Sequence, residues 1–385
     1  MGKSLGLFFT RGVSLRKWVE SGLFDREVQI YHSHIESGYF SRIYWFTYGV
    51  DDTGIASELH DSGRLSKRIE IIPCPQWIRL AGRGGAVLYS LLLPLAVARI
   101  AARCDVFKTN QMEGSIPALI CASIWQRPLY VRTGYTLSRV IKKTSPGNWL
   151  RHMVAMANEY LSFRFASASS VSSRFDRNYI IQRYGAQVTP PMTIGNYVDT
   201  LLFSPFAYEV KVNDRVLYVG RLSPEKNLDN AIAACATVGL GLDIIGAGAE
   251  LLRLKEIAVE CGANVQWLGV VPNNQLPDLF RNYRYFILPS YWEGLPKALI
   301  EAMSAGLVCI GNDATGINEI IEDGVTGYLS PSPDATVLAE TLRRALEGDY
   351  VRISCAGREF ACNNFSLDAI TAKEQAIFTH ILTKQ

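Results

Sequence analysis

The sequence lacks any apolar run long enough to cross a membrane. Its most apolar segment covers residues 86–98 and carries Pro94 near its middle, whereas a transmembrane helix needs about 20 apolar residues. We therefore expect a helix here that is buried or docked on a membrane surface. The apolar run around Phe8 is too short for a secretory signal peptide. The eight cysteines form no Cys-x-x-Cys pair. A reduced, cytoplasmic chain is therefore expected, with peripheral attachment to the inner face of the membrane as a further expectation.

Charge is scarce and unevenly distributed. Charged residues make up 19% of the 385 residues and the net charge is only +3, so nothing indicates a nucleic-acid-binding protein. Residues 1–200 hold 24 basic and 14 acidic side chains, whereas residues 201–385 hold 15 basic and 22 acidic ones. The first half thus has ten positive charges in excess, which predicts that it faces an anionic partner such as a membrane surface or a phosphorylated substrate.

Short apolar runs alternate with longer amphipathic segments, a pattern typical of parallel sheets covered by helices. The length suits two domains. We expect two doubly wound Rossmann-like α/β domains that face each other across a cleft, covering residues 1–200 and 201–366. A Pro-rich linker is expected at residues 189–206. Residues 367–385 are expected to form a helix that packs back on the first domain. Ligands should bind at the carboxyl ends of the strands.

The expected strands are the apolar runs Leu5–Phe9, Ile43–Phe46, Ile69–Ile72, Val106–Lys108, Leu129–Arg132, Arg215–Val219, Leu242–Ile245, Val265–Leu268, Tyr285–Leu288 and Leu307–Ile310. The expected helices are Val87–Ala102, Ile116–Trp125, Trp149–Phe165, Asp229–Thr237, Ala249–Glu260, Lys297–Ala305 and Leu367–Leu382. His32 and His34 suggest a hydrophilic strand end, with a metal site as the alternative.

The strand that ends near Gly220 is followed by two cations, Arg221 and Lys226. A planar guanidinium and an ammonium at the carboxyl end of a strand suit a diphosphate, although two solvated surface cations would give the same pattern. Further along, Gly246 and Gly248 form a Gly-x-Gly turn between a strand and a helix. This turn either approaches a phosphate or only makes a tight connection, because the third glycine of a dinucleotide site is missing.

The most specific segment runs from Pro289 to Gly306 and places Glu293 and Glu301 around Pro296. Pro296 is expected in the first turn of a helix, which leaves the backbone amides of Gly294, Leu295 and Lys297 available to an anionic or hydroxylated ligand. Both carboxylates could then meet one elongated ligand. The alternative makes Glu293 a helix cap and Glu301 a solvated residue, although the apolar neighbours of Glu301 argue against the second part.

With its spacing of seven intervening residues, the pair Glu293 and Glu301 resembles the retaining glycosyltransferases of family 4, which have the GT-B fold. The stretches 195–203, 219–227 and 315–329 resemble the same family in the same order. The resemblance implies that Arg221 and Lys226 neutralise a nucleotide diphosphate, and that Glu293 binds the transferred sugar with the amides of residues 294–297. It also implies that Glu301 binds the ribose, that Val270–Val271 touch the base, and that the loop at Gly12 closes over the phosphates.

One part of the family pattern is missing. Many members carry a histidine in the first domain that faces the reacting sugar, and the matching stretch 129–135 has none. Asn110, Arg132, Thr133 and Tyr135 are the candidates for this surface, and Lys108 is also expected to point to the cleft. The first domain should bind the acceptor, a glycan or a lipid-linked glycan. The resemblance favours UDP as the donor nucleotide and surface polysaccharide or lipopolysaccharide synthesis as the setting.

No cofactor is expected, because the nucleotide-sugar is a substrate. The chain has no Asp-x-Asp sequence to bind a divalent metal ion with the diphosphate, so metal-independent activity is expected. Two other classes stay open at this point: a nucleotide-sugar epimerase or hydrolase of the same fold, and a non-catalytic protein that binds sugar nucleotides. A nicotinamide dehydrogenase is disfavoured, because the Gly-x-Gly-x-x-Gly pattern is absent after the first strand.

Overall fold

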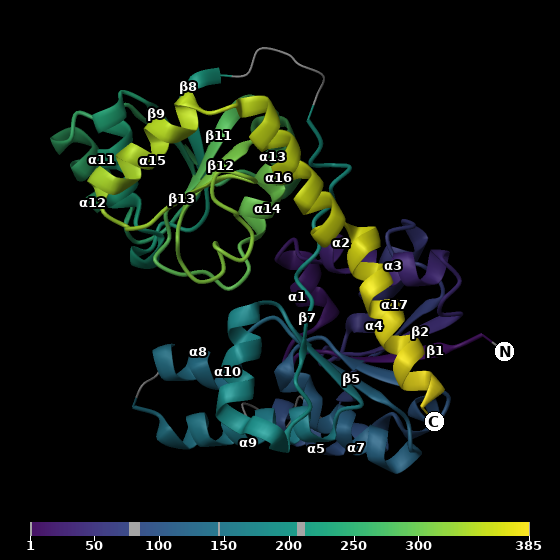
Figure 1. Ribbon diagram of the computed structural model, residues 1–385. Coiled ribbons are helices and arrows are strands. Elements are labelled where there is room, and N and C mark those ends of the chain that lie inside the picture. Colours follow the sequence, from purple (N-terminus) through teal and green to yellow (C-terminus); the bar gives the residue numbers. More distant parts are fainter. Residues whose placement is uncertain (1, 77–84, 145–146, 206–211, 385) are drawn as a thin grey trace. The chain divides into compact units, whose positions relative to one another are not determined.

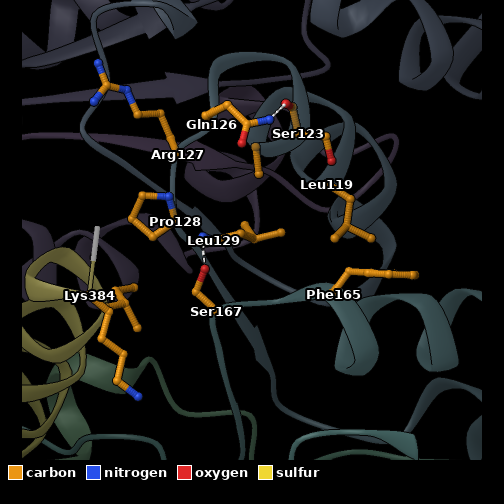
Figure 2. A pocket seen from close by; sticks show the side chains of 11 residues that line it. Leu119, Ser123, Gln126, Arg127, Pro128, Leu129, Phe165, Ser167 and Lys384 are labelled. Atoms are coloured by element: carbon orange, nitrogen blue, oxygen red, sulfur yellow. Dashed lines mark hydrogen bonds between the residues drawn. The ribbon is translucent and has the colours of Figure 1, made fainter.

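A computed structural model describes residues 2–76, 85–144, 147–205 and 212–384. The chain divides into two compact units, one made of residues 1–194 and 371–385 and the other of residues 195–370. The boundaries predicted from the sequence lay at residues 200 and 366, and Phe206 of the predicted linker lies outside the described residues. Each unit contains one parallel sheet with helices on both faces (Figure 1).

The sheet of the first unit has the strand order β3-β2-β1-β4-β5-β6-β7. Its strands are β1 Ser4–Phe8, β2 Arg42–Phe46, β3 Ile69–Ile72, β4 Val106–Thr109, β5 Leu129–Thr133, β6 Ala168–Val171 and β7 Met192–Thr193. Its helices are α1 Leu15–Glu20, α2 Phe24–Glu27, α3 Gln29–Glu36, α4 Asp52–Asp61, α5 Gly85–Ala96, α6 Ala98–Ala101, α7 Ser115–Trp125, α8 Leu137–Thr144, α9 Trp149–Phe165, α10 Arg174–Tyr184 and, from residue 371 on, α17 Leu367–Thr383. Short 3₁₀ helices cover Met112–Gly114 and Gly185–Gln187.

The sheet of the second unit has the order β10-β9-β8-β11-β12-β13. Its strands are β8 Val212–Val219, β9 Gly241–Ile245, β10 Val265–Gly269, β11 Tyr283–Leu288, β12 Val308–Asn312 and β13 Tyr328–Ser330. Its helices are α11 Leu228–Val238, α12 Leu251–Glu260, α13 Leu276–Arg281, α14 Lys297–Ser304, α15 Ala335–Glu347 and α16 Tyr350–Phe365, with 3₁₀ helices at Pro224–Lys226 and Asn273–Gln275.

Both sheets change winding direction once. In the first, the chain moves outward from β1 to β3 and then resumes on the other side of β1 with β4. In the second, the same reversal separates β8 from β11. In open α/β sheets, ligands bind beyond the carboxyl ends of the two strands that flank such a reversal. Each unit therefore has one position in its sheet where a binding site is expected.

Three local predictions were wrong. His32 and His34 lie on helix α3 and not at a strand end. The helix predicted over Val87–Ala102 is broken at Val97, one turn after Pro94, which has no N–H to donate to the helix ladder. Pro296 precedes helix α14 as an extended N-cap residue, so the helix begins at Lys297 and Pro296 lies just outside its first turn.

Candidate active site

The two cations and the first glutamate predicted from the sequence meet at the reversal of the second sheet. Strands β8 and β11 are parallel neighbours. The loop that follows β8 carries Arg221 and Lys226, and the loop that follows β11 carries Glu293. Because parallel strands end at the same edge of a sheet, both loops lie at the carboxyl edge, where the topology predicts a ligand.

Lys226 and Glu293 form an ion pair between these loops. The Lys226 Nζ lies 2.7 Å from Glu293 Oε1, and the Ser290 hydroxyl donates a hydrogen bond of 2.6 Å to the same oxygen. Only 13% of the lysine side chain and 12% of the glutamate side chain are exposed. The groups predicted to hold the diphosphate and the sugar are thus side by side, as they must be if they bind adjacent parts of one molecule.

Arg221 extends into solvent at the same edge. Its side chain is 80% exposed and lies 3.8 Å from Glu225, a surface contact that stabilises by at most about 1 kcal/mol. The backbone of the loop is held more firmly, because the Tyr218 hydroxyl donates a hydrogen bond of 2.9 Å to the Arg221 carbonyl. A guanidinium that is weakly held on a fixed backbone can move to an incoming phosphate without breaking a strong contact.

The Gly-x-Gly turn fixes the cationic loop in place. A Cβ on Gly246 would lie 1.8 Å from the Gly220 carbonyl oxygen, and one on Gly248 would lie 2.0 Å from that of Leu222. The Leu222 amide also donates a hydrogen bond of 3.0 Å to the Ala247 carbonyl. Both glycines are therefore explained by close backbone contact with the loop that carries Arg221. This packing accounts for the Gly-x-Gly turn, so the turn does not require a bound phosphate.

A third glycine, Gly316, supports the loop of Glu293. Gly316 has φ of +84°, and a Cβ there would lie 2.5 Å from the Gly294 carbonyl oxygen and 2.7 Å from that of Glu293. The Glu293 amide donates a hydrogen bond of 2.9 Å to the Thr315 carbonyl. The stretch 315–319, which the sequence singled out only by resemblance, thus acts as the support that sets the position of the Glu293 loop.

The remaining predicted residues of the second unit lie between Glu293 and α14, on α14 itself and, for Val271, after β10. Glu301 lies on α14 and is buried, so it is not a solvated surface residue. The Lys297 ammonium lies 5.6 Å from the centre of the Tyr197 ring. Gly294 faces open space, because a Cβ there would meet nothing within 4 Å. Leu295 and Val271 are half-buried and pack against the core of this unit, and Pro296 is buried.

The predicted residues of the first unit lie near the carboxyl ends of β1, β4 and β5. Gly12 has φ of +75° in the turn after β1. Asn110 follows β4, is nearly buried, and donates its backbone N–H to the Phe8 carbonyl at 2.9 Å. Tyr135 follows β5 and donates a hydrogen bond of 2.9 Å to Glu113 Oε1. The guanidinium of Arg132 lies instead 4.0 Å from Glu374, on the C-terminal helix α17.

A buried ionic cluster around Glu374 was missed by the sequence analysis. Lys108 Nζ lies 2.6 and 2.7 Å from the two carboxylate oxygens of Glu374, and His34 Nε2 lies 3.1 Å from Oε2. Lys108 is therefore engaged with α17 rather than with a ligand. Burial alone raises the pKa of the Glu374 carboxyl, but Lys108 and the hydrogen bond from His34 outweigh it and lower that pKa to about 2. Burial also lowers the pKa of the Lys108 ammonium, against the opposing effect of Glu374.

A signal for this cluster is present in the sequence. Lys108 interrupts an apolar strand, and Glu374 shares the apolar face of its helix with Ile370, Ile377 and Phe378. An isolated buried charge is expensive, so two such positions of opposite sign predict each other. Within residues 2–76, 85–144, 147–205 and 212–384, no group of three or more His, Cys, Asp or Glu could hold a metal ion. The same residues include no helix that is both long and apolar enough to span a bilayer.

Comparison with known proteins places this geometry in context. Residues 207–359 match the family model described as Glycosyl transferases group 1. The chain is 33% identical over 175 residues to the amylovoran biosynthesis glycosyltransferase AmsK of Erwinia amylovora, a match that covers 40% of this chain and 43% of that protein. These similarities support a glycosyltransferase. A further relative is the UDP-Gal:alpha-D-GlcNAc-diphosphoundecaprenol alpha-1,3-galactosyltransferase of Escherichia coli, 29% identical over 178 residues, with 42% of this chain and 46% of the relative covered. The chain spans less than half the length of these curated relatives.

Solved structures extend the similarity to the whole chain. Anabaena HepE in complex with UDP has a TM-score of 0.72 and 20% identity, and the match covers 98% of this chain and 100% of that one. The lipopolysaccharide outer core galactosyltransferase WaaB in its apo form has a TM-score of 0.70 and 18% identity, with 99% and 100% covered. At such identities the likeness establishes the fold alone. The fold is GT-B, which confirms the predicted fold class.

Proposed function

We propose that the protein is a retaining glycosyltransferase of family 4 that moves a sugar from a nucleotide diphosphate-sugar to a glycan or lipid-linked glycan acceptor. The observation that carries the proposal is the contact between Lys226 and Glu293 at the reversal of the second sheet. A cation for the diphosphate and a carboxylate for the sugar hydroxyls meet there, beside the exposed guanidinium of Arg221. The curated relatives named for amylovoran biosynthesis and for colanic acid biosynthesis favour a surface polysaccharide or lipopolysaccharide as the product.

In the proposed reaction, the bond between the anomeric carbon and the phosphate oxygen breaks and its electron pair stays on the phosphate. Arg221, Lys226 and the backbone N–H groups of Gly294, Leu295 and Lys297 stabilise that negative charge. The acceptor oxygen forms the new bond on the same face of the sugar, and its proton passes to the departing phosphate. Glu293 binds hydroxyls of the transferred sugar and Glu301 those of the ribose, so neither carboxylate serves as the nucleophile of a glycosidase.

The donor is expected to be a UDP-sugar, and no metal ion is required in this proposal. The two cationic side chains supply the positive charge that a divalent ion supplies elsewhere. UDP is bound in the solved HepE complex, and UDP-Gal is part of the name of one curated relative. Addition of EDTA should therefore leave transfer unchanged, and loss of transfer that Mn²⁺ restores would contradict metal independence.

The acceptor is proposed to lie at the inner face of the cytoplasmic membrane. The first half of the chain has the positive excess noted above, which suits an anionic lipid surface. Helix α9 begins with four exposed apolar residues, Trp149, Leu150, Met153 and Val154, around the exposed Arg151. Apolar side chains next to a cation are typical of helices that lie on membranes. The protein should float with phosphatidylglycerol vesicles at low salt, and Trp149→Asp should reduce flotation; failure to float even at low salt would refute this part.

The central experiment is a thermal-shift panel of UDP, GDP and ADP with their glucose, galactose, mannose and N-acetylglucosamine derivatives. A ligand that binds the native protein alone raises its melting temperature, and UDP and at least one UDP-sugar should do so. The best donor is then tested for transfer with analysis of the anomeric configuration of the product. Absence of any nucleotide-dependent shift would refute the proposal, and an inverted product would refute retention.

Two other functions predict different products. A nucleotide-sugar hydrolase or epimerase would release free sugar or an epimer at full rate without any acceptor. A non-catalytic binding protein would show the thermal shift without turnover. The presence of Arg221, Lys226 and Glu293 in one place favours the transferase over a binding protein, since a protein that only binds has no need to stabilise a leaving diphosphate.

A further inference from the structure

Three loops of the first unit converge where its sheet reverses. β4 lies between β1 and β5, and all three strands are parallel. The loop after β4 contacts the end of β1, because a Cβ on Gly114 would lie 2.6 Å from the Phe9 carbonyl oxygen. The same loop contacts the loop after β5, since the Gly134 amide donates a hydrogen bond of 2.7 Å to Gln111 Oε1. The residues between Gln111 and Gly114 thus occupy the position at which this topology places a ligand.

Glu113 lies in that loop, and only one of its two carboxylate oxygens has a hydrogen-bond partner among the described residues. Its Oε1 accepts the hydrogen bond of 2.9 Å from the Tyr135 hydroxyl. Its Oε2 is shielded from solvent and has no hydrogen-bond partner among the described residues. A shielded carboxylate oxygen without a partner is unfavourable, because it has lost its hydrogen bonds to water. An oxygen in this state has an unused capacity to accept a hydrogen bond.

Tyr135 holds the carboxylate in one orientation. The phenol is half-buried, and burial together with the neighbouring Glu113 raises its pKa well above the ordinary value. It therefore stays protonated at neutral pH and donates to Glu113. The backbone of Tyr135 is held by a local hydrogen bond, because the Thr133 hydroxyl donates to the Tyr135 carbonyl at 2.6 Å.

We propose that Glu113 binds the acceptor, with Oε2 accepting a hydrogen bond from one of its sugar hydroxyls, and that Tyr135 is the positioning residue for this carboxylate. The assignment rests on the proposed function and adds to it a binding group in the part of the first unit where the family histidine is missing. A carboxylate selects a neutral hydroxyl donor and repels phosphate. The ligand at this place is therefore the sugar ring of the acceptor, and any lipid diphosphate lies elsewhere.

The test compares Glu113→Gln with wild type and with Glu58→Gln, an exposed glutamate on α4 of the same unit. Glutamine keeps an oxygen for Tyr135 but turns an amide donor toward the acceptor hydroxyl. The probes are the UDP-sugars named above with octyl glycosides of glucose, galactose and N-acetylglucosamine as acceptors. The pair that wild type uses best is then taken through steady-state kinetics. A charged hydrogen bond of this kind corresponds to about a 10- to 100-fold change.

We expect Glu113→Gln to lower kcat/KM for the acceptor about 10- to 100-fold, while the donor KM, the UDP-induced thermal shift and the melting temperature stay at wild-type values. Tyr135→Phe should raise the acceptor KM by a smaller factor, because Glu113 is still present but no longer oriented. Glu58→Gln should behave as wild type. If wild type transfers the sugar and Glu113→Gln has the same kcat/KM for the acceptor, the assignment of Glu113 is wrong while the proposed function stands. The same conclusion follows if Glu113→Gln loses equally in kcat/KM for the donor and for the acceptor. Failure of wild type to transfer with every pair would overturn the proposed function, and the assignment with it.

Discussion

Replacing Glu374 by alanine should destabilise the first unit strongly. Lys108 is 1% exposed and Glu374 is fully buried, so the substitution leaves an ammonium in the interior without its counter-charge and beside the guanidinium of Arg132. Removal of one member of a buried pair costs about 3–5 kcal/mol. We expect a loss of this size in the free energy of unfolding of the first unit, measured by urea titration with hydrogen-exchange mass spectrometry of peptides from residues 371–383.

Two variants separate the charge effect from simple loss of packing. Lys108→Met combined with Glu374→Leu removes both charges and should recover most of the lost stability, because apolar residues of similar volume replace buried ion pairs at little cost. Glu36→Ala, at an exposed position on α3, should change stability by less than about 0.5 kcal/mol. A loss below about 1 kcal/mol for Glu374→Ala, or a double variant no more stable than the single one, would refute the reasoning.

The same cluster predicts a pH dependence. The pKa of Glu374 falls from its ordinary 4.5 in the unfolded chain to about 2 in the folded protein, so the unfolded state binds the proton more readily. The stabilisation is complete above pH 4.5 and is lost as the pH falls through about 2. Its size is about 3 kcal/mol. The stability difference between wild type and Glu374→Gln should therefore shrink as the pH falls from 5 to 2, and a constant difference would contradict this account.

Two further predictions concern the second unit. Lys226→Ala should lower kcat about 10²- to 10³-fold, because one of the two cations at the leaving diphosphate is lost. Lys255→Ala, at an exposed position on α12, should leave kcat unchanged. Equal kcat values for the two variants would exclude Lys226 from the reaction. Gly316→Ala should lower both stability and kcat, because the new Cβ displaces the Glu293 loop. Gly324→Ala has a similar positive φ but nothing within 4 Å, so it should cost stability and leave kcat unchanged; a similar loss of kcat in both variants would contradict the supporting role of Gly316.

Most of the fold could be predicted because apolar runs and helical periodicity mark it directly. Every strand expected from an apolar run is present, and α9 has the predicted limits. Strand β6, which was not predicted, shows why some strands give no signal in the sequence. Its sequence, Ala168–Val171, is small and polar, yet Ser169 and Ser170 are buried. The Ser170 hydroxyl lies 2.6 Å from that of Tyr130 on β5. A strand built from small, buried serines gives no apolar signal, even where one of its hydroxyls is paired with a neighbouring strand.

Residues of the candidate site could be predicted only where they lie in a short loop next to a recognisable strand. Arg221, Lys226 and Glu293 lie in loops that follow recognisable strands, so their common edge follows from the sheet topology. Glu113 and Glu374 could not be assigned in this way, because their roles depend on partners distant in sequence. Glu113 needs Tyr135 on another loop, and Glu374 needs Lys108 on another strand. Glu113 looks like an ordinary glutamate until its partner is known, whereas the apolar helix face around Glu374 marks that residue as unusual without showing its partner.

The first unit is completed by the C-terminal residues 371–385, and this has a consequence for biosynthesis. Lys108 emerges from the ribosome 266 residues before Glu374, so during most of translation the central strand β4 holds an ammonium that has no counterion. The first unit must then remain incomplete while the second, whose residues 195–370 are contiguous, can finish folding. Maturation of the amino-terminal half therefore waits for helix α17, which is made after the whole of the second unit.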